Sequence, residues 1–280
     1  MSEFQPGSSW SIKSSRSSVR DGDALALSKW KAWALRPILL FSATYTIVGI
    51  LHELTHALTA YALRIPSTLF PYAVNLDPAH GTLNQRALIG VAGPLLCLAI
   101  GLVSCGAYLR ARNSHWGLPL LYVTMFGVGT FLGNLMSAAF VGDFSRLALA
   151  LQLPMAARYS VSAVGMLLLC GLSFLVGREL RRWAPAEVSA TKAMIGMVAL
   201  PAIVGTAIVV LLFLPMPAAY AYGRIAESSF WIFAAVGTMV SGKRAEESRR
   251  NLQAGWGDIA LLAVATFAVR LTAGGISFAP

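Results

Sequence analysis

Seven apolar segments, separated by short polar connections, constrain the fold of this chain more than any other feature. They cover about 37–62, 87–109, 117–141, 157–177, 193–215, 228–242 and 257–277. All but the short sixth segment reach the roughly 20 residues that a helix needs to cross the hydrocarbon core of a bilayer. Only 12% of the residues are charged, whereas a soluble domain carries about 25%. We therefore predict an all-α, polytopic membrane protein with about seven transmembrane helices.

Lysine and arginine are unevenly distributed over the two ends of these segments. If all seven segments cross and the N-terminus is in the cytoplasm, 16 of the 22 basic residues lie on the cytoplasmic side. Cytoplasmic connections carry an excess of Lys and Arg, so this orientation is the one we expect. The same distribution accounts for the net charge of +10 without nucleic acid. The lipid bilayer is therefore the expected partner, and nucleic acid is not.

The chain begins with a polar segment, residues 1–36, which is rich in serine. Such a composition cannot bury much apolar surface, so we expect a disordered tail. The segment also lacks the early apolar core of a cleavable signal peptide. We therefore expect the first apolar segment to act as an uncleaved signal anchor.

The first apolar segment contains the sequence HELTH, from His52 to His56. Two histidines four residues apart share one face of a helix, where both rings can reach one metal ion. Glu53, between them, can act as a base on a water molecule beside the metal. The alternative is a buried polar cluster that hydrogen-bonds to neighbouring helices, which is costly in lipid. The pattern favours a metal-dependent hydrolase within the membrane.

A catalytic zinc site needs a third protein ligand besides the two histidines. His80, His115 and Asp77 have suitable chemistry, but they lie in connections, where polar residues are usually solvated. Asp143 is the better candidate, because it ends the third apolar segment in the sequence VGDFSR. The alternative for Asp143 is that it only caps the helix that follows it.

Three motifs in this order resemble the site-2 protease family of intramembrane zinc metalloproteases. They are HELTH, the segment Ala92-Gly93-Pro94-Leu95, and the region Asn134–Arg146, which is similar to the family's N-x-x-P…L-D-G-x-R region. The resemblance covers about residues 45–150, so we expect a three-helix metalloprotease core at 37–152 and additional transmembrane helices at 153–280. It implies one Zn²⁺ per chain.

The resemblance also implies a role for each matching residue. His52, His56 and Asp143 would be the metal ligands, Glu53 the catalytic residue, and Asn134 would bind the substrate backbone. This chain departs from the family pattern at several positions. Ser137 and Ala139 replace the prolines that usually follow the asparagine, Phe144 replaces a glycine after the aspartate, and Cys97 stands where many members have asparagine.

The implied activity is cleavage of peptide bonds in or near the transmembrane segments of membrane-protein substrates. Family members pair extended substrate with a strand after the first helix, and Pro66–Arg86 is either such a strand-like loop or a surface loop. We expect a multi-pass protein of a bacterial inner membrane, with the metal site nearer the outer face. Another type of membrane zinc protease uses a glutamate ligand, for which Glu227, Glu246 and Glu247 are the candidates.

The non-enzyme alternative is a catalytically inactive, site-2-protease-like protein that binds or escorts other membrane segments. It predicts no stoichiometric zinc and tolerance of the substitution His56→Ala.

Overall fold

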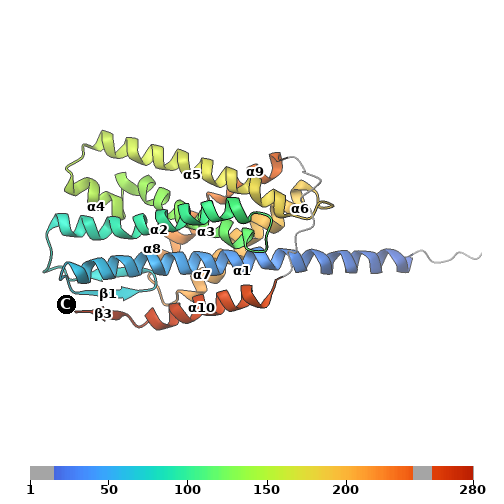
Figure 1. The fold of residues 1–280 in the computed structure, drawn as a ribbon, viewed down its shortest axis with the longest axis horizontal. Coiled ribbons are helices and arrows are strands. Elements are labelled where there is room, and N and C mark those ends of the chain that lie inside the picture. Colours follow the sequence, from blue (N-terminus) through green and yellow to red (C-terminus); the bar gives the residue numbers. More distant parts are fainter. Residues whose placement is uncertain (1–15, 242–253, 280) are drawn as a thin grey trace, which may run out of the picture.

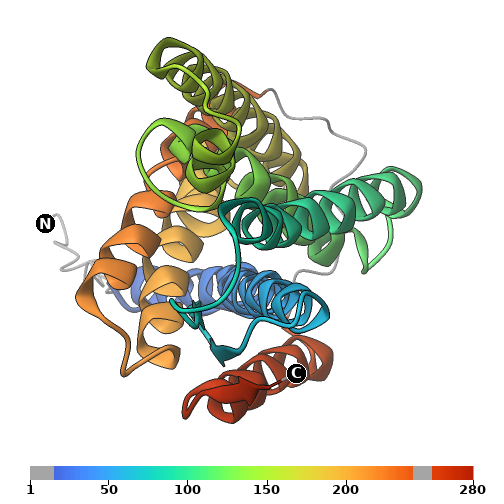
Figure 2. The same ribbon diagram turned by 90° about the vertical axis from the view of Figure 1, so that its left-hand side faces the viewer.

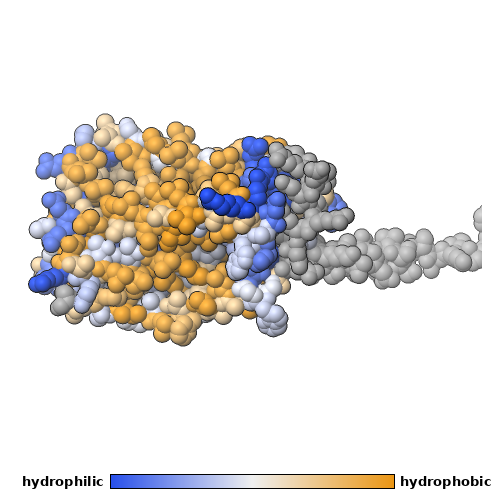
Figure 3. Space-filling view, in the orientation of Figure 1, coloured by the Kyte–Doolittle hydropathy of each residue, from blue (hydrophilic) through white to orange (hydrophobic). Residues whose placement is uncertain are grey.

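Long helices run side by side along the long axis of the computed structural model, which describes residues 16–241 and 254–279 (Figure 1). Five stretches are long and apolar enough to cross a membrane: Trp33–Ala62, Leu83–Ala111, Gly117–Ala139, Met155–Trp183 and Ala190–Leu212. On the face drawn in Figure 3, apolar side chains cover the middle of the molecule and polar side chains gather at both ends of the long axis. This distribution is the one expected of a protein that spans a bilayer.

Ten α-helices follow one another in the part of the chain that the structure describes. They are α1 (Arg16–Ala62), α2 (Leu83–Ala111), α3 (Gly117–Met136), α4 (Asp143–Ala150), α5 (Met155–Trp183), α6 (Ala190–Met194), α7 (Thr206–Leu212), α8 (Ala218–Ser228), α9 (Trp231–Val240) and α10 (Trp256–Thr272). A turn of 3₁₀ helix, η1 (Ser137–Ala139), extends α3, and two π-helical turns, η2 (Ile195–Ala199) and η3 (Pro201–Gly205), join α6 to α7.

Five helices of spanning length, rather than the predicted seven, occur in the part of the chain that the structure describes. The sixth and seventh apolar segments correspond to α9 and α10, which have 10 and 17 residues. At 1.5 Å per residue these helices rise about 15 and 26 Å, less than the roughly 30 Å of the hydrocarbon core. The apolar composition continues beyond the ends of both helices, so helix length supports five spans and leaves the sixth and seventh as predictions.

The first helix begins earlier than predicted. Residues 16–36 were expected to belong to a disordered tail, but α1 starts at Arg16 and continues without a break into the span. A helix that is already nucleated extends at little cost through residues with good helix propensity. The segment ALALSKWKAWAL is such a sequence, and its polarity alone did not indicate this. The earlier part of the predicted tail, residues 1–15, lies outside the described residues.

A small antiparallel sheet follows α1. Strands β1 (Ser67–Phe70) and β2 (Ala73–Leu76) form a hairpin, and Pro71 lies in its turn. The C-terminal strand β3 (Ile276–Phe278) pairs with the other edge of β1. The order β2-β1-β3 therefore places β1 in the centre of the sheet.

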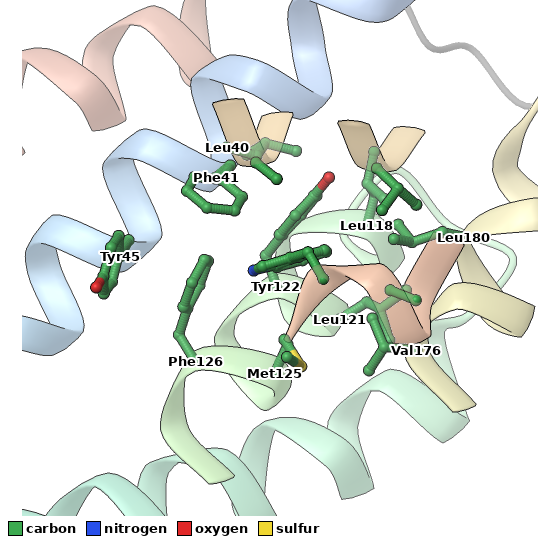
Figure 4. Packing of buried hydrophobic residues seen from close by; sticks show 14 of the residues in the cluster. Leu40, Phe41, Tyr45, Leu118, Leu121, Tyr122, Met125, Phe126, Val176 and Leu180 are labelled. Atoms are coloured by element: carbon green, nitrogen blue, oxygen red, sulfur yellow. The ribbon is translucent and has the colours of Figure 1, made fainter. Parts of the chain in front are cut away.

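An aromatic cluster fixes α1 against α3 and α9 (Figure 4). The ring of Phe126 stacks on Tyr45, with centroids 4.9 Å apart, and meets the edge of Phe41 at the same centroid distance. Trp231 of α9 lies 5.2 Å from Phe41. Aromatic pairs of this kind add about 0.5–1.5 kcal/mol beyond the area that they bury. Tyr45 precedes His52 by seven residues, so the cluster anchors α1 two turns before the histidines.

Viewed along the long axis, α1 lies between α2 on one side and α10 on the other (Figure 2). Helix α2 also packs tightly against α3, where Gly101 and Gly127 face each other. A Cβ on Gly127 would lie 2.7 Å from the carbonyl oxygen of Cys97. Small residues at such a contact let two membrane helices approach closely. Helix α2 is therefore held between α1 and α3.

Candidate metal centre

Two histidines of α1 direct the same ring atom toward a common point. His52 and His56 are one helical turn apart, and their rings are nearly perpendicular, with centroids 4.5 Å apart. Their Nε2 atoms are separated by 3.0 Å. Both residues are buried, at 8% and 5% exposure. The i,i+4 spacing of an uninterrupted helix is sufficient to produce this pair.

Asp143 joins the two histidines from a position 91 residues further along the chain. Its Oδ2 lies 3.1 Å from His52 Nε2 and 3.3 Å from His56 Nε2. The preceding residue, Gly142, has φ of +102°, a conformation that favours glycine. No side chain caps α4. Asp143 therefore does not serve only as a helix cap, because its carboxylate faces the histidines.

The electrostatic environment keeps Asp143 ionised. Burial alone would raise the pKa of its carboxyl group, but hydrogen bonds and positive charge from His52 and His56, when these rings are protonated, outweigh burial and lower that pKa below its ordinary value. The group therefore offers an anionic oxygen at neutral pH.

Helix α2 approaches this cluster through glycine. A Cβ on Gly93 would lie 2.6 Å from both Cε1 and Nε2 of His56 and 3.0 Å from Cε1 of His52. One turn earlier, a Cβ on Gly90 would lie 3.2 Å from the carbonyl oxygen of Asp143. A larger residue at position 93 would need the space of the imidazole rings. This contact gives the segment Ala92–Leu95 a physical role beside the metal centre.

A backbone carbonyl fixes the orientation of His56. Its Nδ1 lies 2.6 Å from the carbonyl oxygen of Ile89. A carbonyl oxygen can only accept a hydrogen bond, so Nδ1 must carry the proton. In the neutral ring the lone pair is then on Nε2, which faces His52 and Asp143. Histidines that bind metals are commonly oriented in this way.

The three ligand atoms can therefore hold a metal ion. His52, His56 and Asp143 each place one ligand atom within 4.8 Å of the other two. Two imidazole lone pairs and a carboxylate oxygen directed at one another repel unless a cation or a proton lies between them. A positive charge at the centre, either a metal ion or a proton, is therefore needed to offset the repulsion among the three ligand atoms.

The remaining predicted site residues lie near this centre. Glu53 is buried, at 8% exposure, and its carboxylate interacts electrostatically with His56. Asn134 lies at the end of α3, where its Nδ2 donates to the carbonyl oxygen of Thr130 at 3.0 Å. A Cβ on Gly142 would lie 3.7 Å from Asn134 Oδ1. Asn134 is therefore beside the turn that leads into Asp143.

The other candidate ligands lie elsewhere. The exposed His80 pairs with Asp77 at 2.9 Å, and His115 packs against Trp116. Glu227 accepts a hydrogen bond from the Tyr45 hydroxyl, and it is not part of the metal-ligand group. Glu246 and Glu247 lie outside the described residues.

Two contacts to the histidines were not predicted from the sequence. The first is the Ile89 carbonyl, which a sequence motif cannot reveal because any residue supplies one. The second is the buried Cys97, whose Sγ lies 3.6 Å from His52 Nδ1. The sequence drew attention to Cys97 only because many family members have asparagine at the matching position, and this gave no indication of a contact with His52.

The chain matches no model of a known protein family, no curated protein and no solved structure.

Proposed function

We propose that this protein is an intramembrane zinc metalloprotease that acts on membrane-protein substrates, as its resemblance to the site-2 protease family implies. One observation carries the proposal. Two histidine nitrogens and one carboxylate oxygen meet within 3.0–3.3 Å of one another in a bundle of apolar helices. A charged cluster in such surroundings is costly unless it has a partner or a function.

The donor set suits zinc. Catalytic zinc sites use three protein ligands drawn from His, Asp, Glu and Cys, and they leave the fourth position open. With ligands at about 2.0–2.1 Å, a tetrahedral site separates its ligand atoms by roughly 3.3 Å. The separations here are 3.0, 3.1 and 3.3 Å. Little rearrangement of His52, His56 and Asp143 would be needed to hold one ion per chain.

The chain supplies the proton transfers. When bound, zinc would polarise the scissile carbonyl and acidify the attacking water. Glu53 would accept the proton of that water and deliver it to the leaving amine. Its burial excludes bulk water from this exchange, and its place between His52 and His56 keeps it one residue from a ligand.

The sheet and Asn134 are suited to present an extended peptide. Because β1 is paired on both sides, a substrate strand would have to add to the outer edge of β2 or of β3. The amide of Asn134, beside Gly142, would hold the substrate backbone near the centre.

The metal centre is not at the middle of α1. His52 is ten residues before Ala62, where the helix ends, which is about 15 Å at 1.5 Å per residue. We propose that the N-terminus is cytoplasmic, because most basic residues gather at the opposite end. The centre would then lie nearer the outer face of the membrane.

Cleavage of a single-span reporter in proteoliposomes tests the proposal. We expect the wild-type protein to cleave it, and a zinc chelator to abolish cleavage. The variant Glu53→Gln should retain zinc and lose about 10²- to 10⁴-fold in rate. The matched control is Glu187→Gln, an exposed residue between α5 and α6, which should behave as wild type. Activity that survives both Glu53→Gln and chelation would exclude this mechanism.

The same experiment tests the alternative of an inactive escort protein. Such a protein would bind the reporter without cleaving it, hold no stoichiometric zinc, and tolerate His56→Ala.

A further inference from the structure

Helix α2 presents three residues to the two histidines at intervals of one turn. The carbonyl of Ile89 accepts from His56 Nδ1, Gly93 lies against both imidazoles, and Cys97 lies beside His52. Positions 89, 93 and 97 share one helical face because they are four residues apart. The helix therefore contacts the outer side of both rings with one rigid surface.

The ring of His52 has only one nitrogen left for this contact. Its Nε2 faces Asp143, so Nδ1 is the nitrogen directed away from the centre. The sulfur of Cys97 lies 3.6 Å from this Nδ1, a normal distance for a hydrogen bond to the large sulfur atom. A thiol is also a weak donor, and the carbonyl oxygen of Val48 lies 4.0 Å from the sulfur. Cys97 can thus accept from His52 while donating to Val48.

We propose that Cys97 is a positioning residue that accepts the Nδ1 proton of His52 and so keeps the Nε2 lone pair directed at the metal. The inference rests on the proposed metal centre. It gives His52 the same kind of partner that Ile89 gives to His56, although from a side chain and not from the backbone.

The surroundings of Cys97 suit a positioning role. The residue is fully buried, at 0% exposure, so water does not compete for the His52 proton. Gly127 of α3 packs on its carbonyl oxygen, which fixes the backbone that carries the thiol. The backbone at Cys97 therefore cannot shift away from His52 without disturbing the contact between α2 and α3.

The two histidines differ in the strength of the hydrogen-bond acceptor that orients each ring. A thiol sulfur is a weaker acceptor than a carbonyl oxygen, and the contact at His56 is 2.6 Å. His52 is therefore the less firmly oriented ligand. Removing its partner should weaken metal binding without removing a ligand atom.

Metal affinity measured on the full-length protein in detergent tests the inference. We compare Cys97→Ala, which removes the acceptor, with Cys97→Ser, which keeps a smaller one, by competition for Zn²⁺ with a chromophoric chelator. The loss of an outer partner typically costs 10- to 100-fold in metal affinity. We expect Cys97→Ala to lose about 10-fold, at the lower end because the acceptor is weak, and Cys97→Ser to stay closer to wild type. The Co²⁺ d–d absorption bands should shift in Cys97→Ala.

The control is Cys105→Ala, the same substitution two turns further along α2, which should change neither affinity nor spectrum. If Cys97→Ala does not fold, Cys97→Val fills the position with a somewhat larger apolar side chain and removes the hydrogen bond, and the same loss is expected. Wild-type affinity and spectrum in the variant without an acceptor would overturn the inference and leave the metal centre intact. An equal loss in Cys97→Ser and Cys97→Ala would also overturn it, because packing would then be the cause. A wild-type protein that binds neither Zn²⁺ nor Co²⁺ would instead overturn the proposed function.

Discussion

The Oδ2 of Asp143 lies 3.1 Å from the Nε2 of His52, although the two residues are separated by 91 positions. His52 is on α1 and Asp143 begins α4, and α2 holds both through Gly90 and Gly93. The candidate metal centre therefore exists only when three helices are packed together. Metal binding to such a centre is coupled to folding.

Removal of the third ligand should abolish stoichiometric metal. In Asp143→Ala only His52 and His56 remain, and we expect affinity for Zn²⁺ to fall by more than the roughly 100-fold that follows loss of an outer partner. Elemental analysis of the purified protein would measure this as a decrease from about one zinc per chain. The control is Asp77→Ala, since the Asp77 carboxylate accepts hydrogen bonds from Ala79 and His80 and is not one of the three ligands. Full zinc content in Asp143→Ala would show that Asp143 is not a ligand.

The glycine that faces the histidines should not tolerate a methyl group. In Gly93→Ala the new Cβ would lie 2.6 Å from His56 Nε2, so a ring or the helix must move. Overpacking of this kind costs about 1–3 kcal/mol, and we expect lower zinc affinity together with a lower midpoint of thermal unfolding.

Gly171→Ala provides the matched comparison for Gly93→Ala. Gly171 is in α5, and nothing lies within 4 Å of the position that its Cβ would occupy. Alanine in a helix is favoured over glycine by about 0.5–1 kcal/mol, so this variant should be as stable as wild type or more so. Equal behaviour of the two variants would contradict the proposed role of Gly93.

Asn134 should affect substrate binding and leave the metal in place. It lies beside Gly142 and is not one of the three ligands. The substitution Asn134→Ala would remove the proposed hydrogen bond to substrate, and such a bond is worth about 0.5–1.5 kcal/mol. We expect the KM for the reporter to rise by about 2- to 10-fold with unchanged zinc content. Asn113→Ala, in the connection between α2 and α3, is the control, and a loss of zinc in Asn134→Ala would point instead to a structural role.

The sequence predicted the site residues through local spacing and through the resemblance, but it did not predict contacts that the backbone makes when helices pack. The i,i+4 spacing of His52 and His56 fixes their shared face in any helix. Asp143 was predicted by its carboxylate at the end of an apolar segment and by the resemblance, and its carboxylate meets both rings. The contact between the Ile89 carbonyl and His56 arises only from the docking of α2 on α1. Because the acceptor is a backbone oxygen, no residue type in the sequence indicates this contact.

The differences between the predicted and observed helix bounds have a similar origin. Hydropathy measures composition, but the length of α9 is set by where its hydrogen-bonded ladder stops, after ten residues. The early start of α1 at Arg16 reflects propagation from an existing helix. The length of α9 and the start of α1 are both set by backbone hydrogen bonding, and hydropathy, which averages side-chain properties, does not detect it.

A buried ion pair should hold α10 against α1. Asp258 Oδ2 lies 3.2 Å from Arg36 Nε, and the two side chains are 10% and 8% exposed. In Asp258→Ala the guanidinium would lose its carboxylate partner and keep its hydrogen bond to the His115 carbonyl. Breaking a buried pair by removing one partner costs about 3–5 kcal/mol, and we expect about 3 kcal/mol because that carbonyl remains.

The double variant Arg36→Met/Asp258→Ala should lose less stability than the sum of the losses in the two single variants, because no unpaired charge is left. Thermal unfolding in detergent measures all three, with Asp77→Ala as control, and a midpoint unchanged in Asp258→Ala would show that other contacts hold α10 in place.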